Sequence, residues 1–360
     1  MKSRTAPFFM LIETTLIEHK TFCMKRIVLF IFTVFYCSIC TAQNFTEVEQ
    51  FMLNNQKQLG DDQALIIYKG GKIIYQKTVG DFKPNIQAPV GESSQWLTAA
   101  LVMIMVQEGK ISLDDNIGKY LPIFPKWMKG YITIRHCLSH TDGIEPDKQG
   151  AGKMFQRNSF SSLEEEANHY AEKRAIVNNP GIWFQYNQIG TNIVGRVLEV
   201  VTKKKFDRLI QEKLLRPMNL RFTTFSNYTS AISPFDGAKS TATEYSNFMS
   251  MLLNKGMYNG KQILTEASVA ELMKIQTGNA LNKFTPSFMN GFSYGLGTWI
   301  ESKDGKMVSA VSQNGPFAWV DYCKGYTCIL LTKKERDPLK RELYDQLKTL
   351  VDAQMSGGCN

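Results

Sequence analysis

One long apolar segment limits the folds open to this chain. Residues 94–108 follow a helical pattern, and almost every position carries an apolar side chain. A helix that is apolar all round has no face to offer to water, so it must lie inside the structure and be covered on all sides. Gly109 directly after it is a typical helix end. The rest of the chain therefore has to supply layers that enclose a central helix.

The patterns on either side of this segment predict those layers. Two β-rich runs, 64–67 and 72–78, surround Lys69-Gly70-Gly71, which is a hairpin signal. The periodicity between residue 91 and residue 289 is mostly helical, and β-rich runs return afterwards. We therefore predict an α+β fold in which an antiparallel sheet from both chain ends is flanked by helices and carries an all-helical insertion. The later strands are expected at 294–300, 307–312, 317–322 and 326–332, and a last amphipathic helix at about 338–354.

The N-terminal residues have the pattern of an export signal. Lys25 and Arg26 precede an apolar run at 27–39, and small residues follow up to Ala42. The run is shorter than the roughly 18 residues that a membrane span needs, so we favour a cleaved signal peptide over an anchor. This predicts an exported protein, periplasmic or extracellular, with no stable membrane span after cleavage. Met24 offers a second start, so whether residues 1–23 are translated stays open.

These patterns define the expected organisation. Residues 1–42 form an N-terminal extension with the signal peptide, and residues 43–360 form one domain. Its sheet regions are predicted at 60–90 and 290–355, with the helical region at 91–289.

The positive charge of the chain is weaker evidence for a nucleic-acid partner than its total suggests. The formal charge is +9, but residues 1–42 carry five Lys or Arg and two acidic residues, so the rest has +6. The densest basic cluster, Lys203-Lys204-Lys205, fits a solvated turn. No zinc-finger spacing or basic stripe with interleaved aromatics occurs, so we expect no nucleic-acid partner.

Four cysteines follow residue 42. Cys323 and Cys328 flank a predicted turn and could face each other across a hairpin as a disulfide, which export would permit. Cys137 lies in an apolar-periodic stretch and is expected to be a buried thiol. No cysteine pair has metal-site spacing with histidines, so we expect no metal and no other cofactor.

Ordered stretches along the chain carry a family resemblance. They read WLTAA at 96–100, EGKISLDD at 108–115, KYLP at 119–122, IRHCLSHTDG at 134–143, PG at 180–181, FQY at 184–186 and YGLG at 294–297. Together they resemble the serine β-lactamase and penicillin-binding protein family, in particular its class C β-lactamase, D-aminopeptidase and esterase branch. The resemblance implies a β-lactamase/transpeptidase-like fold and says less about activity.

The chemistry of that family rests on three short motifs. The resemblance implies Ser-x-x-Lys at the start of the central helix, where the i, i+3 spacing lets Lys take the Ser proton. It also implies Tyr-x-Asn on a loop. The third motif, Lys-Thr-Gly or His-x-Gly, lies on an inner strand, where it binds the substrate carboxylate and lines the oxyanion site.

This chain departs from most of those positions. The stretch at 96–100 fixes the register, so Glu92 falls on the Ser position and Gln95 on the Lys position. Tyr186 matches the family tyrosine, but Gln188 stands where Asn is expected. The strand motif falls on Gln313, Asn314 and Gly315, of which only the glycine is retained.

Glu92 and Gln95 cannot perform the first step of serine hydrolysis. Glu92 has no hydroxyl to form an alkoxide, and Gln95 has no basic nitrogen. They lie one turn apart, so we expect them to hydrogen-bond to each other, and a carboxylate at a helix N-terminus gains about 0.3–1 kcal/mol from the helix dipole. No Lys stands three residues after Ser93 or Ser94, so neither serine has an activating base.

We therefore predict an exported, non-catalytic member of the family that holds a small-molecule, peptide-like or amide-like ligand, with peptidoglycan as one candidate. Gln188, Gln313, Asn314 and Gly315 are the expected binding residues. Two alternatives stay open. One is an active hydrolase, either conventional or using Glu92 as nucleophile or base and Tyr186 as acid on an ester, amide or peptidoglycan-like substrate. The other is a structural protein that acts through its outer surface.

Overall fold

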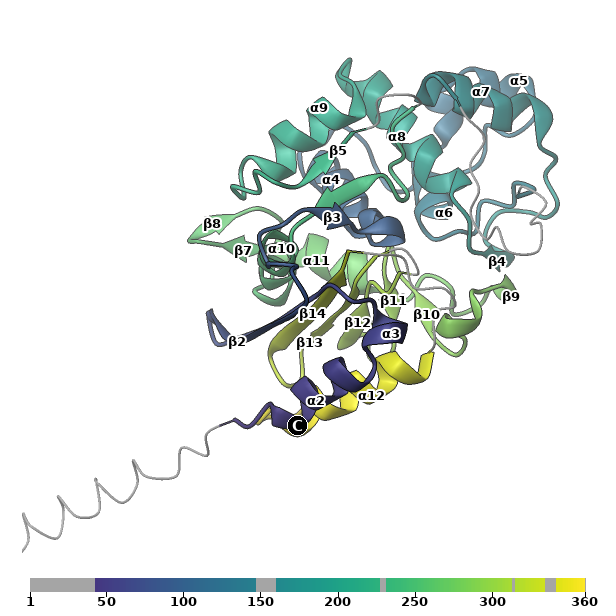
Figure 1. Ribbon diagram of the computed structural model, residues 1–360. Coiled ribbons are helices and arrows are strands. Elements are labelled where there is room, and N and C mark those ends of the chain that lie inside the picture. Colours follow the sequence, from purple (N-terminus) through teal and green to yellow (C-terminus); the bar gives the residue numbers. More distant parts are fainter. Residues whose placement is uncertain (1–42, 147–159, 227–230, 313–314, 334–340, 360) are drawn as a thin grey trace, which may run out of the picture. The chain divides into compact units, whose positions relative to one another are not determined.

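A computed structural model describes residues 43–146, 160–226, 231–312, 315–333 and 341–359 (Figure 1). The compact unit Phe45–Asn360 contains the fold described below. The predicted signal segment and the two predicted binding residues Gln313 and Asn314 lie outside the described residues. No helix in the described ranges is both long enough and apolar enough to span a bilayer.

The main sheet joins the two ends of this unit. Its seven strands lie in the order β10-β11-β12-β13-β14-β1-β2, and all pairs are antiparallel. The early hairpin β1 and β2 adds to the late strands through β14, with Ile66 opposite Ile329. The strands are β1 (Gln63–Lys69), β2 (Lys72–Val79), β10 (Ser293–Tyr294), β11 (Trp299–Ile300), β12 (Met307–Ser309), β13 (Phe317–Asp321) and β14 (Tyr326–Thr332).

The sheet is covered on both faces because its central strands alternate between two apolar clusters. In β1, Ala64 and Ile66 pack into the cluster around the central helix, whereas Leu65 and Ile67 pack into the cluster on the opposite face. The second face is covered by α2 (Thr46–Asn54) and α12 (Arg341–Ala353), which run side by side in Figure 1. The predicted α+β fold, with its sheet drawn from both chain ends, is confirmed.

The predicted central helix is also confirmed. It is α4 (Ser94–Gln107), and every side chain from Ser94 to Met105 is buried. The 3-10 turn η1 (Gly91–Ser93) leads into it. The other helices are α3 (Gln56–Leu59), η2 (Ile117–Lys119), α5 (Ile123–Lys126), α6 (Ile134–Leu138), α7 (Leu163–Lys173), α8 (Ile189–Thr202), α9 (Phe206–Ile210), the π-helical η3 (Gln211–Leu215), α10 (Ala242–Leu253), α11 (Glu266–Met273) and η4 (Ser287–Met289).

Three small sheets complete the described structure. The three-stranded sheet has the order β3-β6-β5, and the parallel pair β4 and β9 leads the chain toward Tyr186. Their bounds are β3 (Ala88–Pro89), β4 (Trp183–Gln185), β5 (Thr224–Phe225), β6 (Ala238–Ser240), β7 (Met257–Tyr258), β8 (Lys261–Gln262) and β9 (Leu281–Phe284).

The expected single strand at 294–300 is wrong. The segment forms two short strands, β10 and β11, joined by a turn at Gly295–Thr298. Gly297 has a φ of 72°, and a Cβ atom there would lie 2.7 Å from the backbone oxygen of Gln95. The glycine lets this turn approach the start of α4, and the break in the strand follows from that approach.

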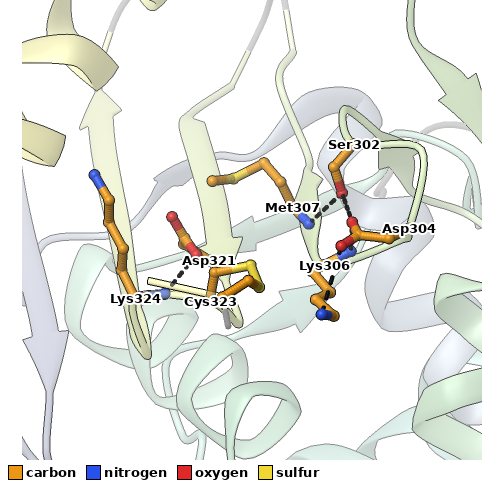
Figure 2. The surroundings of a disulfide bond; sticks show 8 residues. Ser302, Asp304, Lys306, Met307, Asp321, Cys323 and Lys324 are labelled. Atoms are coloured by element: carbon orange, nitrogen blue, oxygen red, sulfur yellow. Dashed lines mark hydrogen bonds and ion pairs between the residues drawn. A yellow bond between two sulfur atoms is a disulfide. The ribbon is translucent and has the colours of Figure 1, made fainter. Parts of the chain in front are cut away.

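The Cys323–Cys328 disulfide that the sequence left open does not form. Cys323 is bonded to Cys359, with 4.6 Å between their Cα atoms. Cys328 is a buried thiol in β14, opposite Trp319, and Cys137 is the buried thiol that was predicted. Figure 2 shows Cys323 in the turn after β13, which is closed by a hydrogen bond from the backbone N–H of Lys324 to Asp321 (2.8 Å). Because Cys328 lies inside the strand with its side chain packed in the core, it cannot turn back to meet a cysteine in that turn.

Candidate functional site

Glu92 lies in the turn before α4 and is tied to the end of the sheet. Its side chain is buried, and its backbone N–H donates to Ser312 Oγ (3.1 Å). The Ser312 hydroxyl in turn donates to the Glu92 carboxylate. These two hydrogen bonds fasten the start of the central helix to the chain just after β12. The predicted hydrogen bond between Glu92 and Gln95 is wrong, because the two side chains take different partners.

Gln95 is the centre of a buried polar cluster. Its Nε2 donates to the Tyr186 hydroxyl (2.7 Å), and its Oε1 accepts from Thr191 Oγ1 (3.1 Å) and Tyr294 Oη (3.3 Å). His140 Nε2 lies 3.0 Å from the same Oε1 and 3.2 Å from Tyr294 Oη. All five side chains are buried. We call this group the Gln95 cluster: Gln95, His140, Tyr186, Thr191 and Tyr294.

Aromatic rings pack around the Gln95 cluster. The His140 ring lies 4.6 Å from the Tyr186 ring, and Trp299 lies 4.7 Å from Tyr294 and 4.9 Å from Tyr186, measured between centroids. Phe184 and Phe235 extend the packing around His140. A polar centre inside such a shell gains strong hydrogen bonds but leaves little room for a charge.

Burial sets the protonation state of the cluster. It lowers the pKa of His140 to about 3, so the imidazole is neutral at physiological pH. Burial is also the main cause that raises the pKa of Tyr186 well above its ordinary value, and the neighbouring Tyr294 and the charge of Glu92 act in the same direction. Burial likewise raises the pKa of Tyr294. The hydroxyls and the imidazole therefore act as neutral hydrogen-bonding groups.

The two serines beside Glu92 are engaged with the backbone. Ser93 Oγ donates to the carbonyl of Ala310 (2.8 Å). Ser94 Oγ donates to the carbonyl of Gly91 (2.5 Å) and accepts the N–H of Ala238 (2.9 Å). Both hydroxyls serve as structural links from the start of α4 to neighbouring strands.

Gln188 and Gly315 are the two predicted binding residues within the described ranges. Gln188 is buried at the N-terminus of α8, two residues after Tyr186. Asn187 between them accepts the N–H of Ile189 (2.8 Å) and donates to the carbonyl of Gln185 (2.7 Å), which shapes the turn. At Gly315 a Cβ atom would lie 2.1 Å from the backbone oxygen of Val90. Only a glycine fits at this position, because the chain passes directly over the turn that carries Glu92.

Sequence reasoning missed three members of the Gln95 cluster: His140, Thr191 and Tyr294. Two of them lie inside stretches that carried the family resemblance, IRHCLSHTDG and YGLG. Those stretches indicated fold, and nothing in their spacing showed that both reach Gln95. His140 has a φ of 54°, a left-handed conformation that turns its side chain out of the preceding helix.

The fold and the positions of these residues define a serine hydrolase scaffold of the β-lactamase type. The model of the Beta-lactamase family matches residues 57–352, so the chain belongs to the β-lactamase family. It is 25% identical over 180 residues to Protein flp of Staphylococcus aureus, covering 46% of this chain and 36% of that protein. It is 24% identical over 274 residues to the "Putative penicillin-binding protein PbpX" of Bacillus subtilis, covering 70% of this chain and 65% of that protein.

A solved structure supports the same fold. The crystal structure of a "putative beta-lactamase" from Bacteroides dorei aligns with a TM-score of 0.78 at 23% identity, covering 86% of this chain and 98% of that one. The chain thus shares the fold over nearly its whole compact unit, while it spans only about a third of Protein flp and about two thirds of PbpX.

Proposed function

We propose that this protein is an exported, non-catalytic member of the β-lactamase family that holds a peptide-like or amide-like ligand. The observation that carries the proposal is the Gln95 amide at the position of the family's lysine. Its oxygen accepts from neutral donors and its nitrogen donates to Tyr186. An amide cannot accept the proton of a nucleophile, so the arrangement offers hydrogen bonds without base catalysis.

The state of the neighbouring hydroxyls supports the same proposal. Ser93 and Ser94 already donate to backbone carbonyls, and neither has a lysine one turn later. Loss of nucleophile and base together removes most of the rate of such an enzyme, and the losses are not additive. What the scaffold still offers is a set of polar groups beside Tyr186 and Gln188 that suits an amide or peptide backbone.

Covalent chemistry is the sharpest test of the non-catalytic part. The purified protein is incubated with nitrocefin, with short-chain p-nitrophenyl esters and with a fluorescent penicillin, followed by intact-mass analysis. We expect no turnover and no added mass. A penicilloyl adduct on any serine would overturn the proposal, and peptide mapping would identify which one.

Ligand binding and export need separate tests. A soluble peptidoglycan stem peptide is titrated calorimetrically against the wild type and Gln188→Ala; we expect saturable binding that the substitution weakens, with the peptide recovered intact. For export, the protein is expressed in a bacterial host and the N-terminus of the exported form is sequenced. We expect it to begin at Gln43, and full-length protein confined to the cytoplasm would contradict export.

A second candidate function rests on Glu92 and Tyr186. The Tyr186 hydroxyl accepts from Gln95 Nε2 (2.7 Å), one helical turn after Glu92, and the charge of Glu92 contributes to the raised pKa of Tyr186. In this alternative Glu92 is a nucleophile or base on an ester or amide. Turnover of any ester that disappears in Glu92→Gln would favour it over the non-catalytic proposal, and turnover that survives the substitution would exclude Glu92 chemistry.

A further inference from the structure

The loop after α5 presents apolar side chains to solvent. Met128 is 82% exposed, Trp127 45% and Tyr131 46%, while Lys126 beside them is exposed as well. We call residues 126–131 the tip loop; it lies next to α5, at the outer end of the helical region in Figure 1. Single exposed apolar residues are ordinary, but a tryptophan and a methionine in succession with a nearby tyrosine on one short loop are a concentrated apolar surface.

A buried lysine anchors the tip loop to the C-terminal end of α7. The buried Lys129 ammonium donates to the carbonyl of Tyr170 (3.3 Å) and to those of Ala171 and Arg174, at the C-terminal end of α7. Its positive charge suits the negative end of that helix. The loop is therefore anchored through the one side chain that points inward, and the side chains around it are left at the surface.

Close backbone packing fixes the shape of the loop. The N–H of Gly118 donates to the carbonyl of Gly130 (3.2 Å), and a Cβ atom at either glycine would lie within 2.8 Å of Pro125. Met128 has a φ of 58°, a left-handed conformation that costs a non-glycine residue free energy. This turn holds Met128 in water rather than in the core, and the exposed pair therefore points to an external partner.

We propose that the tip loop docks on the surface of an anionic phospholipid bilayer. Trp and Tyr are the residues that favour the membrane–water interface, and Met128 between them suits the acyl boundary. The loop is too small for a stable protein interface, which buries about 800 Å² on each partner, whereas a few inserted side chains suffice for reversible bilayer contact. The exposed Lys126 and the net charge of +6 that residues 43–360 carry complement anionic headgroups.

The test uses the full chain and a matched control. Binding to vesicles of equimolar phosphatidylcholine and phosphatidylglycerol is measured by flotation for the wild type, for Trp127→Ser with Met128→Ser, and for Phe222→Ser. Phe222 is 58% exposed elsewhere on the surface, so its loss removes a comparable apolar side chain. We expect the double substitution to weaken binding roughly tenfold and the control to leave it unchanged.

A second readout locates the contact. Bromine-labelled lipids quench tryptophans that enter the bilayer, and residues 1–42 contain no tryptophan, so membrane insertion of that segment gives no direct signal. Trp96, Trp299 and Trp319 are buried, and the half-buried Trp183 in β4 is covered by Lys283, whose Nζ lies 4.1 Å from the ring centroid. We expect quenching in the wild type that Trp127→Ser largely removes, that Trp183→Phe leaves unchanged and that Lys126→Glu reduces. Equal binding of wild type and double variant, or binding without quenching, would overturn the proposal. Self-association that the double substitution abolishes, without vesicle binding, would assign the surface to a second copy instead.

Discussion

The Cys323–Cys359 disulfide fastens the C-terminal segment to the sheet, and its removal should destabilise the fold by a calculable amount. The two cysteines are 36 residues apart in the sequence. In the loop-closure treatment, cross-linking a loop of that length removes unfolded-state entropy worth about 4 kcal/mol at 25 °C. Replacing both cysteines by serine should therefore lower the free energy of unfolding by up to that amount.

Other contacts keep the segment in place when the disulfide is absent. Met355 is buried, Lys324 Nζ donates to the carbonyl of Asp352 (3.0 Å), and the Tyr326 hydroxyl donates to the Asp352 carboxylate. The folded structure of the double variant should therefore resemble that of the wild type. The loss then comes from a freer unfolded chain rather than from lost native contacts.

Guanidinium unfolding by linear extrapolation measures the difference. For a unit of this size the loss corresponds to a fall of about 6 °C in Tm. Wild type reduced with dithiothreitol should match the double variant, and Cys328→Ala should retain the disulfide in non-reducing peptide maps. A loss below about 1 kcal/mol would refute the entropic argument. A disulfide that survives in Cys359→Ala would refute the pairing itself.

Three further predictions concern the site. Gln95→Met should lower the free energy of unfolding by roughly 2–4 kcal/mol, because Thr191 and Tyr294 lose their buried acceptor; denaturant titration measures this, and a change below about 0.5 kcal/mol would contradict the role of the cluster. Glu92→Ser combined with Gln95→Lys should restore labelling by a fluorescent penicillin where neither single substitution does, and labelling in Glu92→Ser alone would show that no lysine is needed. Burial raises the pKa of Asp142 to about 7, against an unfolded value near 4, so the folded state binds more protons and stability should fall as pH rises from about 4 to 7. Asp142→Asn should remove this fall, and a stability difference from wild type that does not vary with pH would contradict it.

Regular apolar patterns made most of the fold predictable. The all-round apolar segment at 94–108 became α4, and the hairpin around Gly70 and Gly71 formed as β1 and β2. The prediction of one strand at 294–300 was wrong because Gly297 lets the chain approach Gln95 closely, and no local sequence pattern encodes that contact. The cysteine pairing failed because Cys359 is distant in sequence, and spacing alone favours near neighbours.

The sequence could predict which residues fall on the family's motif positions, but not which side chains contact each other. Counting back from WLTAA put Gln95 on the family's lysine position and the FQY stretch put Tyr186 on its tyrosine, but the hydrogen bond between these two side chains was not predicted. The orientation of Glu92 depended on Ser312, 220 residues further along the chain, which helix spacing could not show. Helix spacing could not show the contacts of His140 and Tyr294 with Gln95 either, because those contacts form only when distant segments pack together.

The protonation states of the Gln95 cluster narrow the choice between the two proposed functions. General acid–base catalysis is most effective when the pKa of the acting group lies near the working pH. Around Gln95 the imidazole has a pKa of about 3, and both tyrosines have values well above their ordinary range. None of these groups changes its protonation state near neutral pH, so the cluster is poorly suited to moving protons. An active enzyme on this scaffold would therefore need Glu92 as its reactive group, and Glu92 already accepts a hydrogen bond from Ser312. Glu92→Gln is consequently the substitution that separates the two proposals, since it preserves the shape of the side chain and one oxygen that can accept from Ser312, while it removes the charge.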